Sequence, residues 1–228
     1  ELPTENRIDF QEDKVFEKNF RRILNERSGK IWFVITITDY AAIIVSLAKM
    51  IKLIDPARPL SLLIYKHHRW DSVDLDDLKP YFENIRILPR LFYSLRPSRL
   101  IKTIKLARAI KNFKIGAEDI IIGTSHFEFA ENCLISYHKS AKKIAILTEK
   151  EFHLFYETEH YRGVNFCQNK AGLFYNKIFE PLLGLYRTLF FHQAGGDIFN
   201  LTRYQKPLNE IYDEVYILDI PKAKKIFA

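Results

Sequence analysis

Cysteine, glycine and long apolar runs are all scarce in this sequence, and each shortage excludes a class of protein. Cys133 and Cys167 are the two cysteines among 228 residues, which is too few for a disulfide framework and gives no CxxC zinc signature. No apolar run approaches the roughly 18–20 uncharged residues that a membrane-spanning helix needs. The N-terminal residues ELPTENRIDFQEDK lack the basic and apolar regions of a signal peptide. We therefore expect a soluble globular protein in a reducing cytoplasm.

The phosphate-binding and nucleophile motifs that depend on glycine are missing. No GxGxxG follows the first apolar run, where Asp39-Tyr40-Ala41-Ala42 stands instead, so the usual dinucleotide-binding fold is disfavoured. Neither GxxxxGK[ST] nor GxSxG occurs, which removes support for P-loop and α/β-hydrolase chemistry. Asp74, Asp76 and Asp77 resemble a DxD metal motif, but acids are also favoured in the first turn of a helix, and we expect no metal site.

Positive charge exceeds negative charge, since 35 Lys and Arg against 28 Asp and Glu give a net charge of +7. This balance suits three anionic partners: a small substrate, nucleic acid or a membrane surface. Cations recur at a spacing of three, without an intervening acid, at Arg96, Arg99, Lys102, Lys105, Arg108, Lys111 and Lys114. Around a helix this spacing drifts by roughly 60° per step, so the charges spiral instead of forming one stripe.

The spiral argues against a helix that reads a nucleic-acid groove, and no recognisable nucleic-acid motif accompanies it. Together with an aromatic segment of helical period at 171–192, the basic segment suits docking onto an anionic membrane leaflet. A solvated basic face and an aromatic core helix explain the same residues. Both interpretations stay open at the level of sequence.

Apolar runs alternate with segments of helical period along most of the chain. We expect strands at 30–39, 60–65, 85–88, 119–123, 143–148 and 214–218, and helices at 16–24, 41–54, 71–81, from Ser98 within 96–117, and at 128–140. Continuous apolar strands separated by helices are typical of a parallel sheet covered on both sides. The sequence therefore predicts an α/β fold: a Rossmann-like parallel sheet with helices on both faces, plus an aromatic helical segment near the C-terminus.

This pattern also suggests a domain organisation. We expect an N-terminal helical segment at 1–29, a Rossmann-like domain at 30–220 and the start of an interdomain linker at 221–228.

Polar side chains follow the expected strands, where a parallel sheet would gather them at one edge. The candidates are Thr38 and Asp39, His67, Ser125 and His126, and Glu149 and Glu151. Hydroxyls, imidazoles and carboxylates together suit a polyhydroxylated substrate such as a sugar, and they suit proton transfer. We therefore expect a polar ligand site at this edge.

Simpler explanations exist for most of these residues. Asp39 suits the N-cap of the helix that begins at Ala41, and Ser125 suits the N-cap of the helix that begins near Phe127. His67 and its neighbour suit a solvated loop. Glu149 is the residue that no expected helix needs, although an exposed loop acid is the alternative to a catalytic one.

Three stretches carry a resemblance to a known family. They are WFVITITDYAAIIVSLAKMI, DIIIGTSHFEFAENCLISYHKSAKKIAILTEKEF and the aromatic segment at 171–192. In their order they resemble the N-terminal half of GT-B bacterial sialyltransferases, of the polysialyltransferase and lipooligosaccharide sialyltransferase types. The resemblance covers most of residues 30–218. It implies an acceptor-binding domain of a glycosyltransferase involved in bacterial surface polysaccharide or lipooligosaccharide synthesis.

The resemblance assigns roles to the candidate residues. In that family a strand at the position of 144–147 ends in an acid-acid-glycine motif whose acid is the general base, and Glu149 matches the first acid. Lys150 and Glu151 stand where the family has the second acid and the glycine. The resemblance implies Glu149 as the base. From their positions after the strands, we expect Glu151 to be the second candidate and His126 and Asp39 to orient the acceptor or the base. The residues expected to bind the acceptor are Asp39, Thr38, Ser125 and His67.

The family binds its nucleotide-sugar, here CMP-sialic acid by resemblance, through a His-Pro motif in a C-terminal domain. The sequence contains no His-Pro pair, so we expect that domain to follow Ala228, no cofactor in this chain, and no activity from the 228 residues alone. The resemblance also implies a cytoplasmic protein at the periphery of the inner membrane. The rival hypothesis is a non-catalytic, flavodoxin-like binding or assembly module whose basic surface faces a membrane or polyanion.

Overall fold

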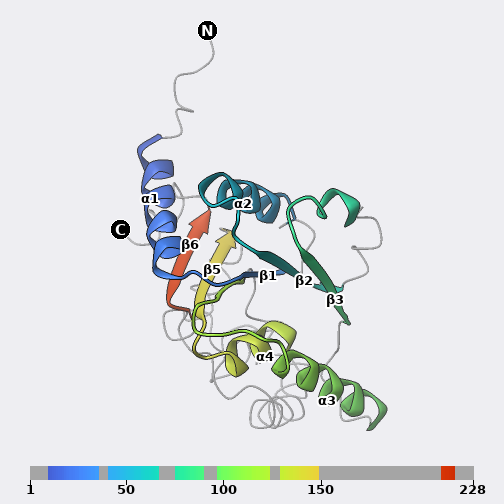
Figure 1. Ribbon diagram of the computed structural model, residues 1–228. Helices are drawn as coiled ribbons and strands as arrows, with labels where there is room; N and C mark the ends of the chain where they lie inside the picture. The colour runs from blue at the N-terminus through green and yellow to red at the C-terminus, as the bar shows by residue number, and fades with distance from the viewer. Residues whose placement is uncertain are drawn as a thin grey trace, which may run out of the picture.

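The computed structural model describes residues 10–35, 41–66, 75–89, 97–123, 129–148 and 212–218 (Figure 1). Six strands form one sheet: β1 Ile31–Ile35, β2 Leu60–Lys66, β3 Asn84–Pro89, β4 Ile120–Gly123, β5 Lys142–Thr148 and β6 Glu214–Leu218. The helices are α1 Phe10–Glu26, α2 Ala41–Ile54, the short 3-10 helix η4 Leu75–Asp77, α3 Pro97–Lys111 and α4 Phe129–Tyr137. Every neighbouring pair of strands is parallel, in the order β3-β2-β1-β4-β5-β6.

The central strands are continuous apolar runs because both of their faces are covered. All five residues of β1 and all four of β4 are buried. In a strand, successive side chains point to opposite faces, so such a run can be buried only between two layers of helices. The edge strand β3 is half-exposed, and its final residue is Pro89, which costs no ladder hydrogen bond at a sheet edge.

The helices α1 and α2 cover one face of the sheet (Figure 1). The buried residues of α2, Ile44, Leu47, Ala48 and Ile51, recur at i, i+3, i+4 and i+7 and therefore form one stripe. They pack with Phe20 of α1 and with Phe33 of β1 into a single core cluster.

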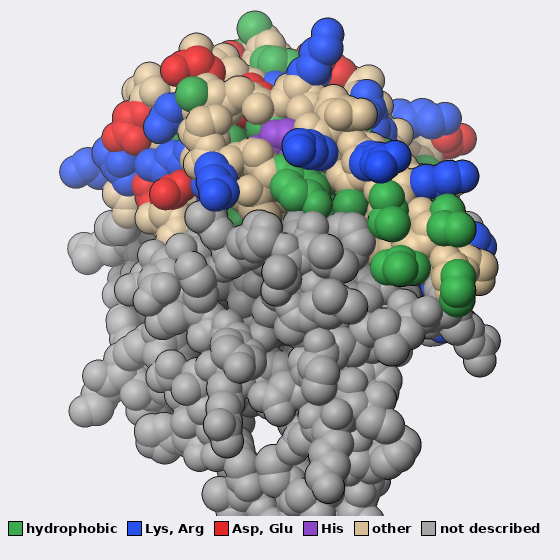
Figure 2. Space-filling view, turned by 90° about the horizontal axis from the view of Figure 1, so that it is seen from below, with side chains coloured by type: hydrophobic (Ala, Val, Ile, Leu, Met, Phe, Trp, Pro, Cys, Tyr) green, Lys and Arg blue, Asp and Glu red, His purple; other side chains and the backbone are tan. Residues whose placement is uncertain are grey.

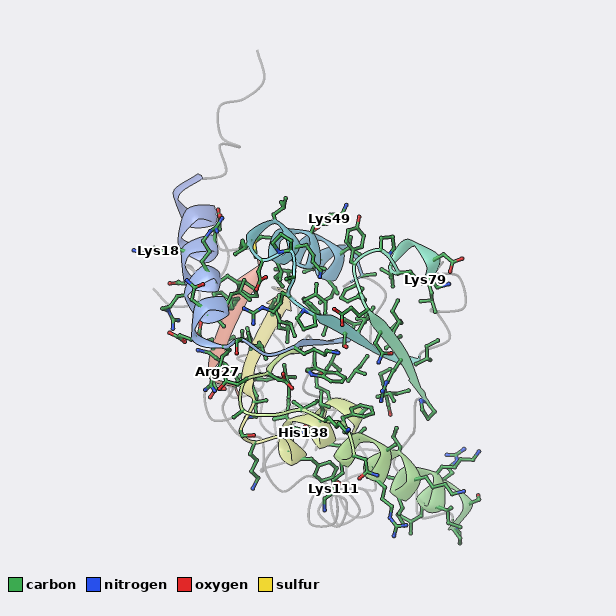
Figure 3. All side chains as sticks on the ribbon, viewed as in Figure 1. Lys18, Arg27, Lys49, Lys79, Lys111 and His138 are labelled. Carbon is green, nitrogen blue, oxygen red and sulfur yellow. The ribbon has the colours of Figure 1, made fainter. Side chains whose placement is uncertain are left out.

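The helices α3 and α4 cover the opposite face, where Val34 and Ile121 point (Figure 1). Leu106 and Ile110 of α3 and Leu134 of α4 pack against these strands. At the end of α4, buried His138 lies beside α3 (Figure 3), and its Nε2 is 2.9 Å from the carbonyl oxygen of Ile110. A carbonyl can only accept, so this ring nitrogen carries the proton and the histidine joins the two helices.

The predicted fold class is confirmed: the chain is α/β, with an all-parallel, Rossmann-like sheet between two layers of helices. The helix predicted at 41–54 and the strand predicted at 214–218 have these bounds in the structure. The N-terminal helix is longer than predicted, because it begins at Phe10 and ends at Glu26. The aromatic segment at 171–192 and the linker at 221–228 lie outside the described residues.

The helix predicted at 71–81 is wrong over its described part. Residues 75–77 form a single 3-10 turn, and a further turn follows to Tyr81. Leu78 and Phe82 are both buried in the core cluster. A folded loop is enough to bury these two side chains, so the segment does not need to form a helix. No described helix is both long enough and apolar enough to cross a membrane.

Candidate functional site

The sheet has one place where its strand order reverses, between β1 and β4. The chain runs outward from β1 through β2 to β3, then returns to the other side of β1 and continues through β4 and β5 to β6. The next helix after β1 is α2 and the next after β4 is α4, and these two helices cover opposite faces of the sheet. In open parallel sheets, ligands bind in the crevice beyond the carboxyl ends at such a point.

The strand ends at this point are aligned by the sheet register. Val34 lies opposite Gly123, and Gly123 lies opposite Ala145. The last described residue of β1 is Ile35 and that of β4 is Gly123, so the chain leaves these two strands at nearly the same height.

The seven predicted site residues follow four strands that are direct neighbours, β2, β1, β4 and β5. His67 follows β2, Asp39 follows β1, His126 follows β4, and Glu149 follows β5. The side chains themselves lie outside the described residues, as do those of Thr38, Ser125 and Glu151. The structure therefore places their points of attachment together at one sheet edge, and their roles stay predictions.

A buried polar pair, which the sequence did not indicate, lies just beneath this edge. Glu131 in the first turn of α4 is completely buried, and the hydroxyl of Tyr212 donates a 2.9 Å hydrogen bond to its Oε1. Tyr212 is itself 3% exposed and lies two residues before Glu214, the first residue of β6. A carboxylate near a helix N-terminus is favoured by the helix dipole, which offsets part of the cost of its burial.

Gly123 makes room for this pair. A Cβ at this position would collide with Oε1 of Glu131 and would lie 3.1 Å from the hydroxyl oxygen of Tyr212. The last residue of β4 must therefore be glycine for the carboxylate to reach its buried position. Gly123, Glu131 and Tyr212 together hold both ends of the β4–α4 loop, in which the predicted residues Ser125 and His126 stand.

The cysteine on α4 has no properties of a nucleophile. Burial raises the pKa of the Cys133 thiol far above its usual range, although a hydrogen bond with Tyr137 partly opposes this. Burial likewise raises the pKa of Tyr137. A thiolate, not a thiol, is the attacking species, so cysteine chemistry at this position is disfavoured.

No group of His, Cys, Asp and Glu in the described part of the chain could hold a metal ion. Asp76 of the predicted DxD pattern belongs to η4, and its carboxylate is 2.5 Å from the ammonium of Lys79. It is exposed and paired with a cation, which is the environment of a surface residue. Asp74 lies outside the described residues.

The opposite, amino-terminal edge of the sheet carries a network of ion pairs. Lys142 at the start of β5 is 2.7 Å from Glu214 of β6 and 3.3 Å from Glu26 of α1. Arg22 bridges the same two carboxylates at 2.9 and 2.6 Å. The network joins α1 to the edge of the sheet and lies away from the candidate site.

These cations change the acidity of both carboxylates. Hydrogen bonds from Arg22 and Lys142 lower the pKa of Glu26. Burial alone would raise the pKa of Glu214, but hydrogen bonds from Lys142, Tyr216 and Arg22 outweigh it, and the pKa is lowered. Both acids are therefore ionised and structural at neutral pH.

No family model matches the chain, and neither a curated protein nor a solved structure matches it.

Proposed function

We propose that this chain is the acceptor-binding, Rossmann-like domain of a GT-B glycosyltransferase, sialyltransferase-like, in the synthesis of a bacterial surface polysaccharide or lipooligosaccharide. One observation carries the proposal. All seven candidate residues follow four neighbouring strands and so start from one edge of the sheet, across the β1–β4 reversal. This edge is the usual ligand position of the fold, and its hydroxyls, imidazoles and carboxylates suit a sugar acceptor.

Glu149 is the proposed general base. It takes the proton from the acceptor hydroxyl as that oxygen attacks the anomeric carbon of the donor, and the bond from this carbon to the phosphate breaks. With CMP-sialic acid as donor, CMP leaves with the electron pair. Glu151 is the second candidate for the base, and His126 and Asp39 orient the acceptor or the base.

Binding of the acceptor falls to Thr38, Ser125 and His67, whose hydroxyls and imidazole pair with sugar hydroxyls. The donor nucleotide is bound by a second domain. The Glu131–Tyr212 pair supports the roles of Ser125 and His126, because it packs against Gly123 and so holds the residues on both sides of the segment that contains them.

Replacement of the base tests the proposal in the full-length protein. Transfer of labelled sialic acid from CMP-sialic acid to a lipooligosaccharide acceptor is measured for Glu149→Gln. Removing a general base lowers kcat by about 100-fold or more, while an amide of the same shape leaves KM for the acceptor nearly unchanged. Glu118→Gln is the matched control, because Glu118 is exposed at the opposite edge of the sheet, where it pairs with Ser28.

Two results would contradict the proposal in different ways. An unchanged transfer rate in Glu149→Gln would show that Glu149 is not the general base. Full activity of the isolated 228 residues would show that no second domain is needed to bind the donor.

The rival function is a non-catalytic binding or assembly module. The observation that favours it is the exposed basic surface of α3, which no catalytic role requires. It predicts no transfer of sugar by the full-length protein with any Glu149 variant or with the wild type.

A further inference from the structure

The helix α3 presents a surface of uniform charge. Six cations on or just after it are exposed, and the sequence PSRLIKTIKLARAIK contains no acid. They are Arg99, Lys102, Lys105, Arg108, Lys111 and Lys114. We call these residues, with Ile101, the α3 surface.

The first half of α3 projects beyond the body of the protein. None of its first six residues, 97–102, is buried. Its buried residues begin at Thr103 and continue with Leu106, Ala107 and Ile110, and in the first half Leu100 packs against the core while partly exposed. The helix runs out past the tip of β3 (Figure 1). A projecting helix end can meet a flat partner without interference from the sheet.

Among the residues that the structure describes, no acid neutralises the charge of the α3 surface. Within the described residues, none of its six cations forms a salt bridge, whereas Arg22, Arg58 and Lys142 are all paired with carboxylates. On the side of the molecule that carries α3 and α4, Lys and Arg side chains lie beside a group of apolar ones (Figure 2). The positive potential of this side is therefore available to an external anion.

An apolar side chain lies among these cations. Ile101 is 53% exposed, which is unusual for a large hydrophobic residue in this protein. On a helix, Lys105 and Arg108 at i+4 and i+7 flank it, on the side opposite to the buried stripe. An apolar residue surrounded by long, flexible cations is typical of a helix that lies in a bilayer interface.

We propose that the α3 surface docks the protein onto an anionic lipid bilayer. Ile101 enters the boundary between headgroups and acyl chains, and the cations around it contact lipid phosphates. The spiral of charges suits a bilayer, because headgroups move to meet them, whereas duplex phosphates stand in fixed rows. An exposed isoleucine at the centre also has no role against a phosphate backbone.

Docking by α3 orients the candidate site. The helix connects the parallel strands β3 and β4, so it begins on the side of their carboxyl ends, where the residues after β1, β4 and β5 also start. The end of α3 that projects is this first end. A bilayer bound there lies close to the candidate edge, within reach of an acceptor held in the membrane. The docking itself does not depend on the proposed transferase activity.

Flotation of the whole chain with lipid vesicles tests the proposal. Vesicles of phosphatidylcholine with phosphatidylglycerol should bind the protein, those of phosphatidylcholine alone should not, and added salt should release it. Each cation near an anionic surface contributes about fivefold in affinity, so Lys102→Gln/Lys105→Gln/Arg108→Gln should weaken binding on the order of 100-fold.

A second triple variant removes the same charge elsewhere. Lys18, Lys49 and Lys79 are exposed on the α2 side of the sheet, away from Lys111 of the α3 surface (Figure 3). Lys18→Gln/Lys49→Gln/Lys79→Gln should bind vesicles within about twofold of wild type, since its cations do not face the bilayer. Circular dichroism confirms that both triple variants are folded. Equal weakening of vesicle binding in the two triple variants would show that binding depends only on the net charge of the protein, and it would overturn the proposal.

Ile101→Ser separates a bilayer from a nucleic acid. It keeps every charge and should weaken vesicle binding by about three- to tenfold. Binding of the wild type to duplex DNA is measured alongside. If the α3 triple variant loses DNA binding, Ile101→Ser does not alter it, and vesicles are not bound, the surface is a nucleic-acid interface and the bilayer proposal is wrong.

Discussion

Tyr212 donates a hydrogen bond to the buried carboxylate of Glu131, across 81 residues of sequence. The pair joins the first turn of α4 to the start of β6, and it lies against Gly123, the last residue of β4. This one polar contact, beside Gly123, thus links the carboxyl end of β4 and the first turn of α4 to the segment that leads into β6. Gly123 and Glu131 stand on either side of the segment that contains the candidate residues Ser125 and His126.

Tyr212→Phe should lower the free energy of unfolding by about 1–3 kcal/mol, because a buried carboxylate then loses a donor that water cannot replace. Urea denaturation monitored by circular dichroism measures the change. Tyr216→Phe is the control. It removes a tyrosine hydroxyl that donates a 2.7 Å bond to Glu214, and Glu214 retains Lys142 and Arg22 as partners. Its cost should stay below about 1 kcal/mol, and equal losses in both variants would show that burial of the Glu131 pair is unimportant.

Gly123→Ala should destabilise the protein by about 1–3 kcal/mol, because the new methyl group displaces the Glu131 carboxylate from its buried bond. Adding Glu131→Ala should remove most of this penalty, so that the two substitutions are strongly coupled in a double-mutant cycle. Gly116→Ala is the control, since a Cβ there meets nothing within 4 Å. Additive effects of Gly123→Ala and Glu131→Ala would contradict the predicted clash.

The sheet and α2 could be predicted because their signals are local. Five residues in a row are buried in β1, and the stripe Ile44, Leu47, Ala48 and Ile51 has a strictly helical period. The sequence also located the polar residues after the strands. Strand order could not be derived from the same pattern, because several orders satisfy it. Only the structure shows that β2, β1, β4 and β5 are neighbours.

The contacts beneath the candidate site could not be predicted, since each joins residues far apart in sequence. Glu131 stands in an apolar helix, FAENCLISY, and such an acid is compatible with either a solvated or a buried position. Its burial depends on a glycine at 123 and a tyrosine at 212. Arg58 is a similar case, because three of its partners are backbone carbonyls, which carry no sequence signal.

Arg58→Met should lower the free energy of unfolding by about 2–4 kcal/mol. Arg58 is 6% exposed, and its guanidinium donates to the carbonyls of Leu24, Arg27 and Gly29 and to the carboxylate of Asp55. Its removal leaves the carbonyls of Leu24, Arg27 and Gly29, between the end of α1 and the start of β1, without these hydrogen bonds. Thermal and urea denaturation measure the loss.

Arg21→Met is the matched control for this substitution. Its guanidinium is exposed and pairs only with Glu17 one turn away, according to the described contacts. Such a pair contributes less than about 0.5 kcal/mol. A loss from Arg58→Met as small as this would show that the carbonyls of the α1–β1 junction are satisfied without the arginine.

The network around Lys142 predicts a loss of stability in acid. The pKa values of Glu26 and Glu214 are lowered in the folded protein from the usual 4.5, so the unfolded chain binds more protons as pH falls. Their stabilisation is present above about pH 4.5 and disappears as pH falls through the folded pKa values.

Lys142→Met removes a partner of both acids and should make the decline between pH 5 and pH 3 shallower, as measured by urea denaturation at each pH. Because the acids of α1 are exposed, salt should also flatten the decline. A steeper decline in Lys142→Met would mean that the two carboxylates are not stabilised by the network.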